Sequence, residues 1–186
     1  MTLTMSLTLR LLGIALLMSL FLAGMVVTHA SARAGGTEVR LSMEPVDPRD
    51  LLLGHYVIIQ TPVHRLSLDG LGGDTGHSWQ RGDSIWVVLT ESEGVFNPVS
   101  VHRRQPEGLS IQGRVFFSSP GWTDEGPVLT VRYNLERYFA SPEDALALEE
   151  LRNESRLRLI VSVGSDGSAI IRGLEIDGED HIDRLF

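Results

Sequence analysis

An uncharged apolar run near the N-terminus constrains this chain more than any other feature of its sequence. The run extends from Leu11 to Val27, 17 residues without a charge, and it follows Arg10. A helix that crosses a bilayer needs about 20 predominantly apolar residues, whereas the core of a cleaved signal peptide has about 7–15. Both interpretations send the rest of the chain across a membrane. We therefore expect a hydrophobic anchor or signal segment over residues 1–34 and an extracytoplasmic domain over residues 35–186.

Two features bear on whether this segment is retained. The length of the apolar run favours an uncleaved transmembrane helix. The triplets Ala30-Ser31-Ala32 and Ala32-Arg33-Ala34 fit the small-x-small pattern of a signal-peptidase site, which favours cleavage. Charge does not decide between them, because Arg33 and Arg40 beyond the run outnumber Arg10 before it. We expect a single-pass inner-membrane protein with a periplasmic domain, and the alternative is a secreted periplasmic protein.

Composition excludes several kinds of chemistry. The chain has no cysteine, so disulfides, thiolate metal sites and cysteine nucleophiles are absent. All 16 basic residues are arginine, which removes lysine-dependent mechanisms and suggests GC-rich codons in a bacterial source. From Thr37 onward, 14 arginines stand against 24 acidic residues, a formal charge of −10. An acidic domain repels nucleic-acid phosphates, so nucleic acid is not an expected partner.

Alternation of apolar and polar residues predicts that the exported domain is mainly β-sheet. The alternation places Val95, Val99 and Val101 on one inward face, and Leu109, Ile111, Val115 and Phe117 on another. The continuous apolar run Ile85–Leu89 predicts a strand buried on both faces. Further alternating runs begin at Val39, Leu129, Leu157 and Ser168. We expect eight to nine strands in an antiparallel sheet that is sandwich-like or barrel-like.

Local signals predict the turns and the helix of this domain. The loop Gly164–Gly167 separates two alternating runs, as in a β-hairpin. Ser141 suits a helix N-cap and Pro142 suits the first helical position, so one helix is expected from Pro142 to Asn153. The small residues of Ser31–Gly36 predict a short linker between the apolar segment and the first strand.

The stretch "PVDPRDLLLGHYVIIQTPV", from Pro45 to Val63, contains the candidate binding residues. Pro48 restricts its own backbone and that of the residue before it, which is typical of a rigid turn that leads into a strand. The same stretch can instead form a polar cluster that binds a peptide or a lipid headgroup. The members of that cluster would be Asp47, Arg49, Asp50, Gly54, His55 and Tyr56.

These residues also resemble the signature of the GDYXXLXY protein family. The resemblance begins with Asp47-Pro48-Arg49-Asp50 and Gly54-His55-Tyr56. Further matching segments are Asp83–Leu89, Tyr133–Phe139 with the acidic helix after it, and the closing hairpin Gly167–Gly178. The resemblance covers roughly Gly36 to Gly178. It implies a membrane-anchored bacterial protein without an established activity, often associated with polytopic membrane proteins.

The chain departs from the name-giving pattern at three positions. His55 stands at the aspartate, Ile59 at the leucine and Thr61 at the final tyrosine. Ile59 is conservative, whereas His55 removes a carboxylate. A catalytic role for that carboxylate would therefore be impaired in this chain.

The remaining motifs indicate no specific reaction centre. Serine hydrolysis of the signal-peptidase type needs a lysine, and the sequence has no Gly-x-Ser-x-Gly elbow. The internal histidines lie in separate segments without metal-site spacing, so no metal or other cofactor is expected. Four arginines lie on the polar sides of their predicted strands, namely Arg132, Arg156, Arg158 and Arg172. They can form a stripe that binds a carboxylate or phosphate, or a solvated face balanced by acids such as Glu136 and Glu175. Both interpretations remain open.

We expect a binding or assembly module that docks on a polytopic inner-membrane protein, with Pro45–Val63 as its contact surface. The alternatives are an acid–base hydrolase of envelope polymers and a soluble periplasmic ligand-binding protein.

Overall fold

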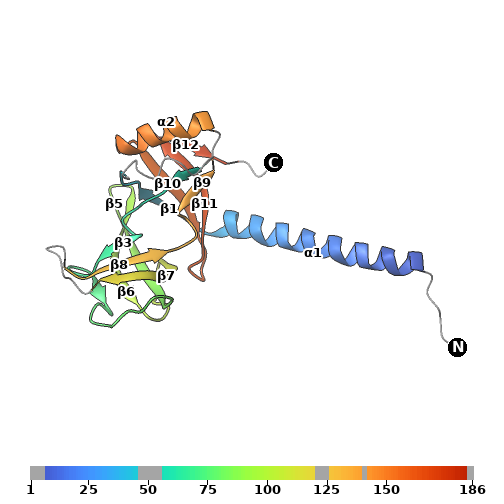
Figure 1. Cartoon of the computed structure of the whole chain (residues 1–186), viewed down its shortest axis with the longest axis horizontal. Helices are drawn as coiled ribbons and strands as arrows, with labels where there is room; N and C mark the ends of the chain where they lie inside the picture. The colour runs from blue at the N-terminus through green and yellow to red at the C-terminus, as the bar shows by residue number, and fades with distance from the viewer. Residues whose placement is uncertain (1–6, 46–55, 120–125, 140–141, 184–186) are drawn as a thin grey trace.

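The computed structural model describes residues 7–45, 56–119, 126–139 and 142–183 (Figure 1). One long helix leads into a β-rich domain that contains one further helix, which confirms the predicted fold class. The elements in chain order are α1 (Leu7–Gly35), β1 (Thr37–Ser42), β2 (Tyr56–Ile58), β3 (Arg65–Ser67), β4 (Gly72–Gly73), β5 (Ser84–Ser92), β6 (Val95–His102), β7 (Ser110–Ser119), β8 (Val128–Arg132), β9 (Arg137–Phe139), α2 (Pro142–Asn153), β10 (Leu157–Val163), β11 (Ala169–Ile176) and β12 (Glu179–Ile182).

Helix α1 projects from the domain on its own (Figure 1). The segment Leu9–Thr28 is long and apolar enough to cross a membrane, by length and composition, and none of it is buried. At 1.5 Å per residue its 20 residues extend about 30 Å, close to the hydrocarbon thickness of a bilayer. The predicted linker Ser31–Gly36 is wrong, because α1 continues to Gly35 and only Gly36 separates it from β1. Alanine favours helix strongly, and no proline or glycine interrupts this segment before Gly35.

Two large open sheets build most of the described domain, and β2 and β9 form a separate two-stranded sheet. The first has the order β1-β10-β11-β12, and the second has the order β3-β8-β7-β5-β6-β4. All ladders are antiparallel except the one between β4 and β6. Apolar side chains of both sheets form one core, so the arrangement is sandwich-like, and neither sheet closes into a barrel over the described residues.

The structure has more strands than the eight to nine expected from the sequence. Four of the twelve, β2, β3, β4 and β9, have only two or three residues, too few for alternation to reveal. Strand β12 is a further short strand near the C-terminus. Its side chains are exposed, and its backbone pairs with β11.

The predicted inward faces are wrong in part on β6 and β7, because each strand contains a β-bulge. Val88 pairs with Ser100 and Leu89 with Pro98, so Val99 is an extra residue in the ladder and is 40% exposed. Likewise, Val115 pairs with Val131 and Phe117 with Thr130. Phe116 is then the extra residue, and Phe117 is 58% exposed. A bulge inserts one residue and so reverses the facing of every side chain beyond it.

Strand β5 is buried less completely than the apolar run suggested. Ile85, Val87 and Leu89 are buried, whereas Trp86 and Val88 on the other face are half-buried. The predicted hairpin is confirmed, because β10 pairs with β11 across Gly164–Gly167. The predicted helix is confirmed with the same limits, Pro142 to Asn153. Its proposed cap, Ser141, lies outside the described residues.

Candidate functional site

Most of the sequence-predicted cluster lies outside the residues that the structure describes. This applies to Asp47, Arg49, Asp50, Gly54 and His55, whereas Tyr56 begins strand β2. Strand β2 pairs antiparallel with β9, with Tyr56 opposite Phe139 and Ile58 opposite Arg137. The pairing therefore joins two segments that carry the family resemblance and lie about 80 residues apart in the sequence.

Helix α2 secures this two-stranded ladder through a buried arginine. The guanidinium Nη1 of Arg152 donates a 2.9 Å hydrogen bond to the carbonyl oxygen of Ile58, and Arg152 is only 3% exposed. The backbone N–H of Ile59 donates to the carbonyl of Glu136 at 3.0 Å, which extends the pairing past the strand ends. No local pattern in the sequence marks Arg152, because its acceptor is 94 residues away.

A buried polar cluster lies where the chain leaves β2 and enters β9. The side chains of Thr61 and His64 are joined by a 2.9 Å contact between Oγ1 and Nδ1, and the Thr61 N–H also points at Nδ1 at 3.2 Å. Because Nδ1 accepts from a backbone N–H, the neutral ring carries its proton on Nε2. That Nε2 atom lies 3.9 Å from Glu136 Oε1, beyond hydrogen-bond distance, and has no partner in the described part of the chain.

Burial sets the protonation of this cluster. It lowers the pKa of His64 below its usual value, and the Glu136 carboxylate only partly opposes the effect. Burial also raises the pKa of the Tyr133 phenol well above its usual value. A neutral histidine beside a threonine resembles a base and its nucleophile. Thr61, however, is 0% exposed, so its hydroxyl cannot reach a substrate and the contact is structural.

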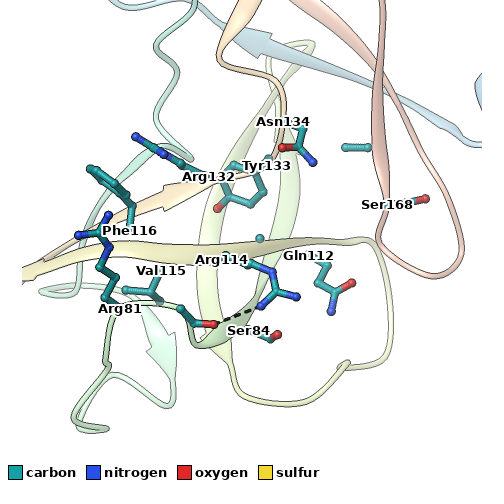
Figure 2. A pocket seen from close by; sticks show the side chains of 13 residues that line it. Arg81, Ser84, Gln112, Arg114, Val115, Phe116, Arg132, Tyr133, Asn134 and Ser168 are labelled. Atoms are coloured by element: carbon teal, nitrogen blue, oxygen red, sulfur yellow. Dashed lines mark hydrogen bonds between the residues drawn. The ribbon is translucent and has the colours of Figure 1, made fainter.

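A pocket of about 580 Å³ opens on the second sheet and is lined by three arginines (Figure 2). We call it the arginine pocket, after Arg81, Arg114 and Arg132. The ring of Phe116 lies at the same end as Arg81 and Arg132. The remaining polar side chains of the lining are uncharged, and they are Ser84, Gln112, Tyr133, Asn134 and Ser168.

Strand register places the pocket residues in one row. Arg114 on β7 is the direct partner of Ser84 on β5 and of Arg132 on β8. Arg114 donates a long hydrogen bond of 3.4 Å to the carbonyl of Gly82. The Arg132 guanidinium carbon lies 3.6 Å from the centre of the Phe116 ring, and that of Arg81 lies 4.8 Å from it. Both are cation–π distances.

The predicted arginine stripe is wrong as a single surface. Arg158 and Arg172 lie on the first sheet and Arg156 directly precedes its strand β10, whereas Arg132 lies on the second sheet. These three arginines on or beside the first sheet are paired with acids, namely Arg156 with Asp177 and Glu154, Arg158 with Glu175, and Arg172 with Glu38. That face is therefore the charge-balanced surface that formed the other interpretation. Glu136 does not balance it, because its carboxylate accepts from the Tyr133 N–H at 2.7 Å.

Electrostatically, the arginine pocket differs from the group of acid-paired arginines on and beside the first sheet. No Asp or Glu is among its described lining residues, and Arg81, Arg114 and Arg132 have no ion pair within the described part of the chain. A second cleft of about 670 Å³ adjoins it, because Phe116 and Arg132 line both, and His64 and Glu136 border that cleft. Sequence analysis singled out only Arg132 of the three, since the pocket depends on pairing between strands.

These observations define the class as a β-rich, two-sheet domain carried directly on one N-terminal apolar helix. The chain belongs to the GDYXXLXY family, since the family model described as GDYXXLXY protein matches residues 18–174. The match begins inside α1, so part of the apolar helix belongs to the family pattern. No curated protein and no solved structure matches the chain.

Proposed function

We propose that this protein is a single-pass inner-membrane protein whose periplasmic β domain is a binding module that docks on a membrane-protein partner. The observation that carries the proposal is the join between α1 and the domain. The span Leu9–Thr28 is exposed throughout, and the helix continues without a break to Gly35, one residue before β1. An apolar helix of this length is stable only when lipid or protein covers it.

The short connection between α1 and β1 also limits how far the domain can lie from the membrane. Seven helical residues, 29–35, separate the apolar span from the domain, which is about 10 Å at 1.5 Å per residue. Where α1 meets the domain, α1 contacts β10 and β11, and a cleft of about 260 Å³ lies between Gly35 and the Gly164–Ser165 turn. A short helical connection holds the domain close to the bilayer surface. A partner in the same membrane is therefore the partner within reach.

The experiment is purification of the full-length protein from detergent-solubilised membranes, with intact mass and partner identification on one sample. We expect an intact N-terminus and a membrane protein in stoichiometric amount. A solitary protein trimmed near Ala32 would overturn the proposal and indicate a soluble periplasmic domain.

A matched chimaera shows which part of the chain docks. In it, residues 7–28 are replaced by an unrelated transmembrane helix of equal length, and the domain is left unchanged. Retained capture of the same partner places the contact on the β domain. Lost capture with normal membrane insertion would mean that α1 makes the contact and that the domain is not the docking module.

A further inference from the structure

We propose that the arginine pocket is a binding site for the phosphate group of a small polyol phosphate, of which glycerol phosphate is the simplest example. The phosphate can belong to a free solute or to a lipid headgroup, because both present the same chemistry. This site goes beyond partner docking and does not depend on it, since its residues lie on β5, β7, β8, the start of β11 and nearby loops of the described domain.

The strand register creates an unbalanced pair of charges. Arg114 and Arg132 are direct neighbours across β7 and β8, where side chains on one face stand about 5 Å apart at Cβ. Like charges directly opposite one another destabilise a sheet. On the first sheet an acid neutralises such an arginine, as Glu175 does for Arg158 at 2.8 Å. In the pocket the described residues supply no acid, so a bound anion would remove the repulsion.

Phe116 holds two of the three guanidinium groups in place. It is the extra residue of the β7 bulge, and bulges redirect side chains near functional sites. The guanidinium groups of Arg81 and Arg132 both lie against its ring. A guanidinium stacked on a ring keeps its N–H groups in its own plane, where they remain able to donate to a ligand. Ordering these side chains before binding lowers the entropy cost of capturing an anion.

The number of arginines favours phosphate over carboxylate. A carboxylate has two oxygens and is matched by one guanidinium fork, whereas a tetrahedral phosphate offers three or more acceptor oxygens and can accept from several guanidinium groups. The pocket is also larger than a phosphate group. Its other end carries the hydroxyls of Ser84 and Ser168 and the amides of Gln112 and Asn134, which are suited to ligand hydroxyls.

The test is calorimetric titration of the full-length protein in detergent at low salt with glycerol 3-phosphate. Arg132→Gln is compared with Arg104→Gln, which removes the same charge from an exposed arginine on a different pocket. We expect at least tenfold weaker binding in Arg132→Gln and unchanged binding in Arg104→Gln. Arg81→Gln is a second variant outside any strand, so it tests the site without altering a ladder. Equal loss in Arg104→Gln would overturn the proposal, because only net charge would then matter.

Three further ligands test the stated chemistry. Glycerate carries a carboxylate in place of the phosphate, and tight binding of glycerate would overturn the preference for phosphate. Inorganic phosphate lacks the polyol hydroxyl groups. If it bound as tightly as glycerol phosphate, the proposal that the pocket also recognises a polyol would be overturned. Two negative results together would overturn the site itself. In the first, glycerol 3-phosphate fails to bind the protein in detergent. In the second, phosphatidylglycerol has no arginine-dependent effect on protein reconstituted into phosphatidylcholine vesicles.

The same vesicles identify the source of the phosphate. If phosphatidylglycerol in the vesicles weakens the titration of free glycerol phosphate, and Arg132→Gln removes this competition, the site accepts a lipid headgroup. If the titration is unchanged by phosphatidylglycerol, the site takes the free solute. Either result supports a phosphate site, and both can be obtained whether or not a membrane-protein partner is captured.

Discussion

The hydroxyl group of Tyr133 donates a 2.9 Å hydrogen bond to the backbone carbonyl of Val63, a residue 70 positions away in the chain. Both residues are almost fully buried, at 5% and 0% exposure. The bond connects the segment after β2 to the segment between β8 and β9, and so it holds the two sides of the buried polar cluster together. Because burial raises the pKa of this phenol, the donor proton is retained at every pH near neutrality.

Replacing Tyr133 with phenylalanine removes this donor and keeps the ring. The Val63 carbonyl is then buried without its hydrogen bond, which costs about 1–3 kcal/mol of the free energy of unfolding. Denaturant unfolding of the full-length protein in detergent measures the loss. The control is Tyr138→Phe, whose hydroxyl donates to the Asp183 carboxylate at a half-buried site where water can replace it. Equal losses in the two variants would contradict the special role of the Tyr133 bond.

His64 should make the stability of the domain depend on pH. Its pKa is lowered in the folded state, so between that value and about 6.5 the unfolded chain binds a proton that the folded chain does not. Stability is therefore complete above about pH 6.5 and falls as the pH decreases below it, by up to about 1.4 kcal/mol per pH unit. Unfolding of His64→Gln across pH 5–8 should lack this contribution.

The control for this pH dependence is His181→Gln, because His181 is exposed on β12. This variant should follow the wild-type curve. If His64→Gln kept the wild-type slope below about pH 6.5, the buried histidine would not be its origin.

Alanine substitutions at two glycines with positive φ distinguish the cost of backbone strain from the cost of a steric clash. Gly167 has a φ of +75° and Gly178 a φ of +87°, a region that costs other residues about 1–2 kcal/mol. A Cβ on Gly178 would meet nothing within 4 Å, whereas one on Gly167 would collide with the Trp86 ring. We expect Gly178→Ala to lose about 1–2 kcal/mol, and Gly167→Ala to lose about 1–3 kcal/mol more through overpacking. Unfolding measures the difference, and the near-UV circular dichroism of Trp86 should change only in Gly167→Ala.

Side-chain exposure predicts opposite outcomes at an apolar position on β10 and at one beyond the β7 bulge. Leu159 is 0% exposed, so Leu159→Ala should cost about 2–5 kcal/mol of unfolding free energy. Phe117 is 58% exposed beyond the bulge, so Phe117→Ser should change stability by no more than about 0.5 kcal/mol. Chemical denaturation compares the two. A large loss in Phe117→Ser would mean that this side chain faces the core, as unbroken alternation predicts.

Sequence analysis succeeded where the physical signal is local. The limits of α2 follow from a proline at the first helical position and from apolar spacing, and both act within one helix. Four residues of β10 are buried as their alternation predicts, namely Leu157, Leu159, Val161 and Val163. The bulge in the β10–β11 ladder does not disturb them, because its extra residue, Arg172, lies on β11. The candidate site was less predictable. Arg132 belongs to it, but its neighbours are Arg114 and Arg81 and not the arginines of the first sheet.

The sequence by itself determined the apolar N-terminal helix, the β-rich character of the domain, the single internal helix and the family. Each of these rests on composition or on a short-range period that a few neighbouring residues express. Only the tertiary structure decided the bulges at Val99 and Phe116, the continuation of α1 to Gly35, the buried contacts of Tyr133 and His64, and the arginine pocket. Strand register decides which residues lie opposite one another, and register depends on pairing between segments far apart in the chain.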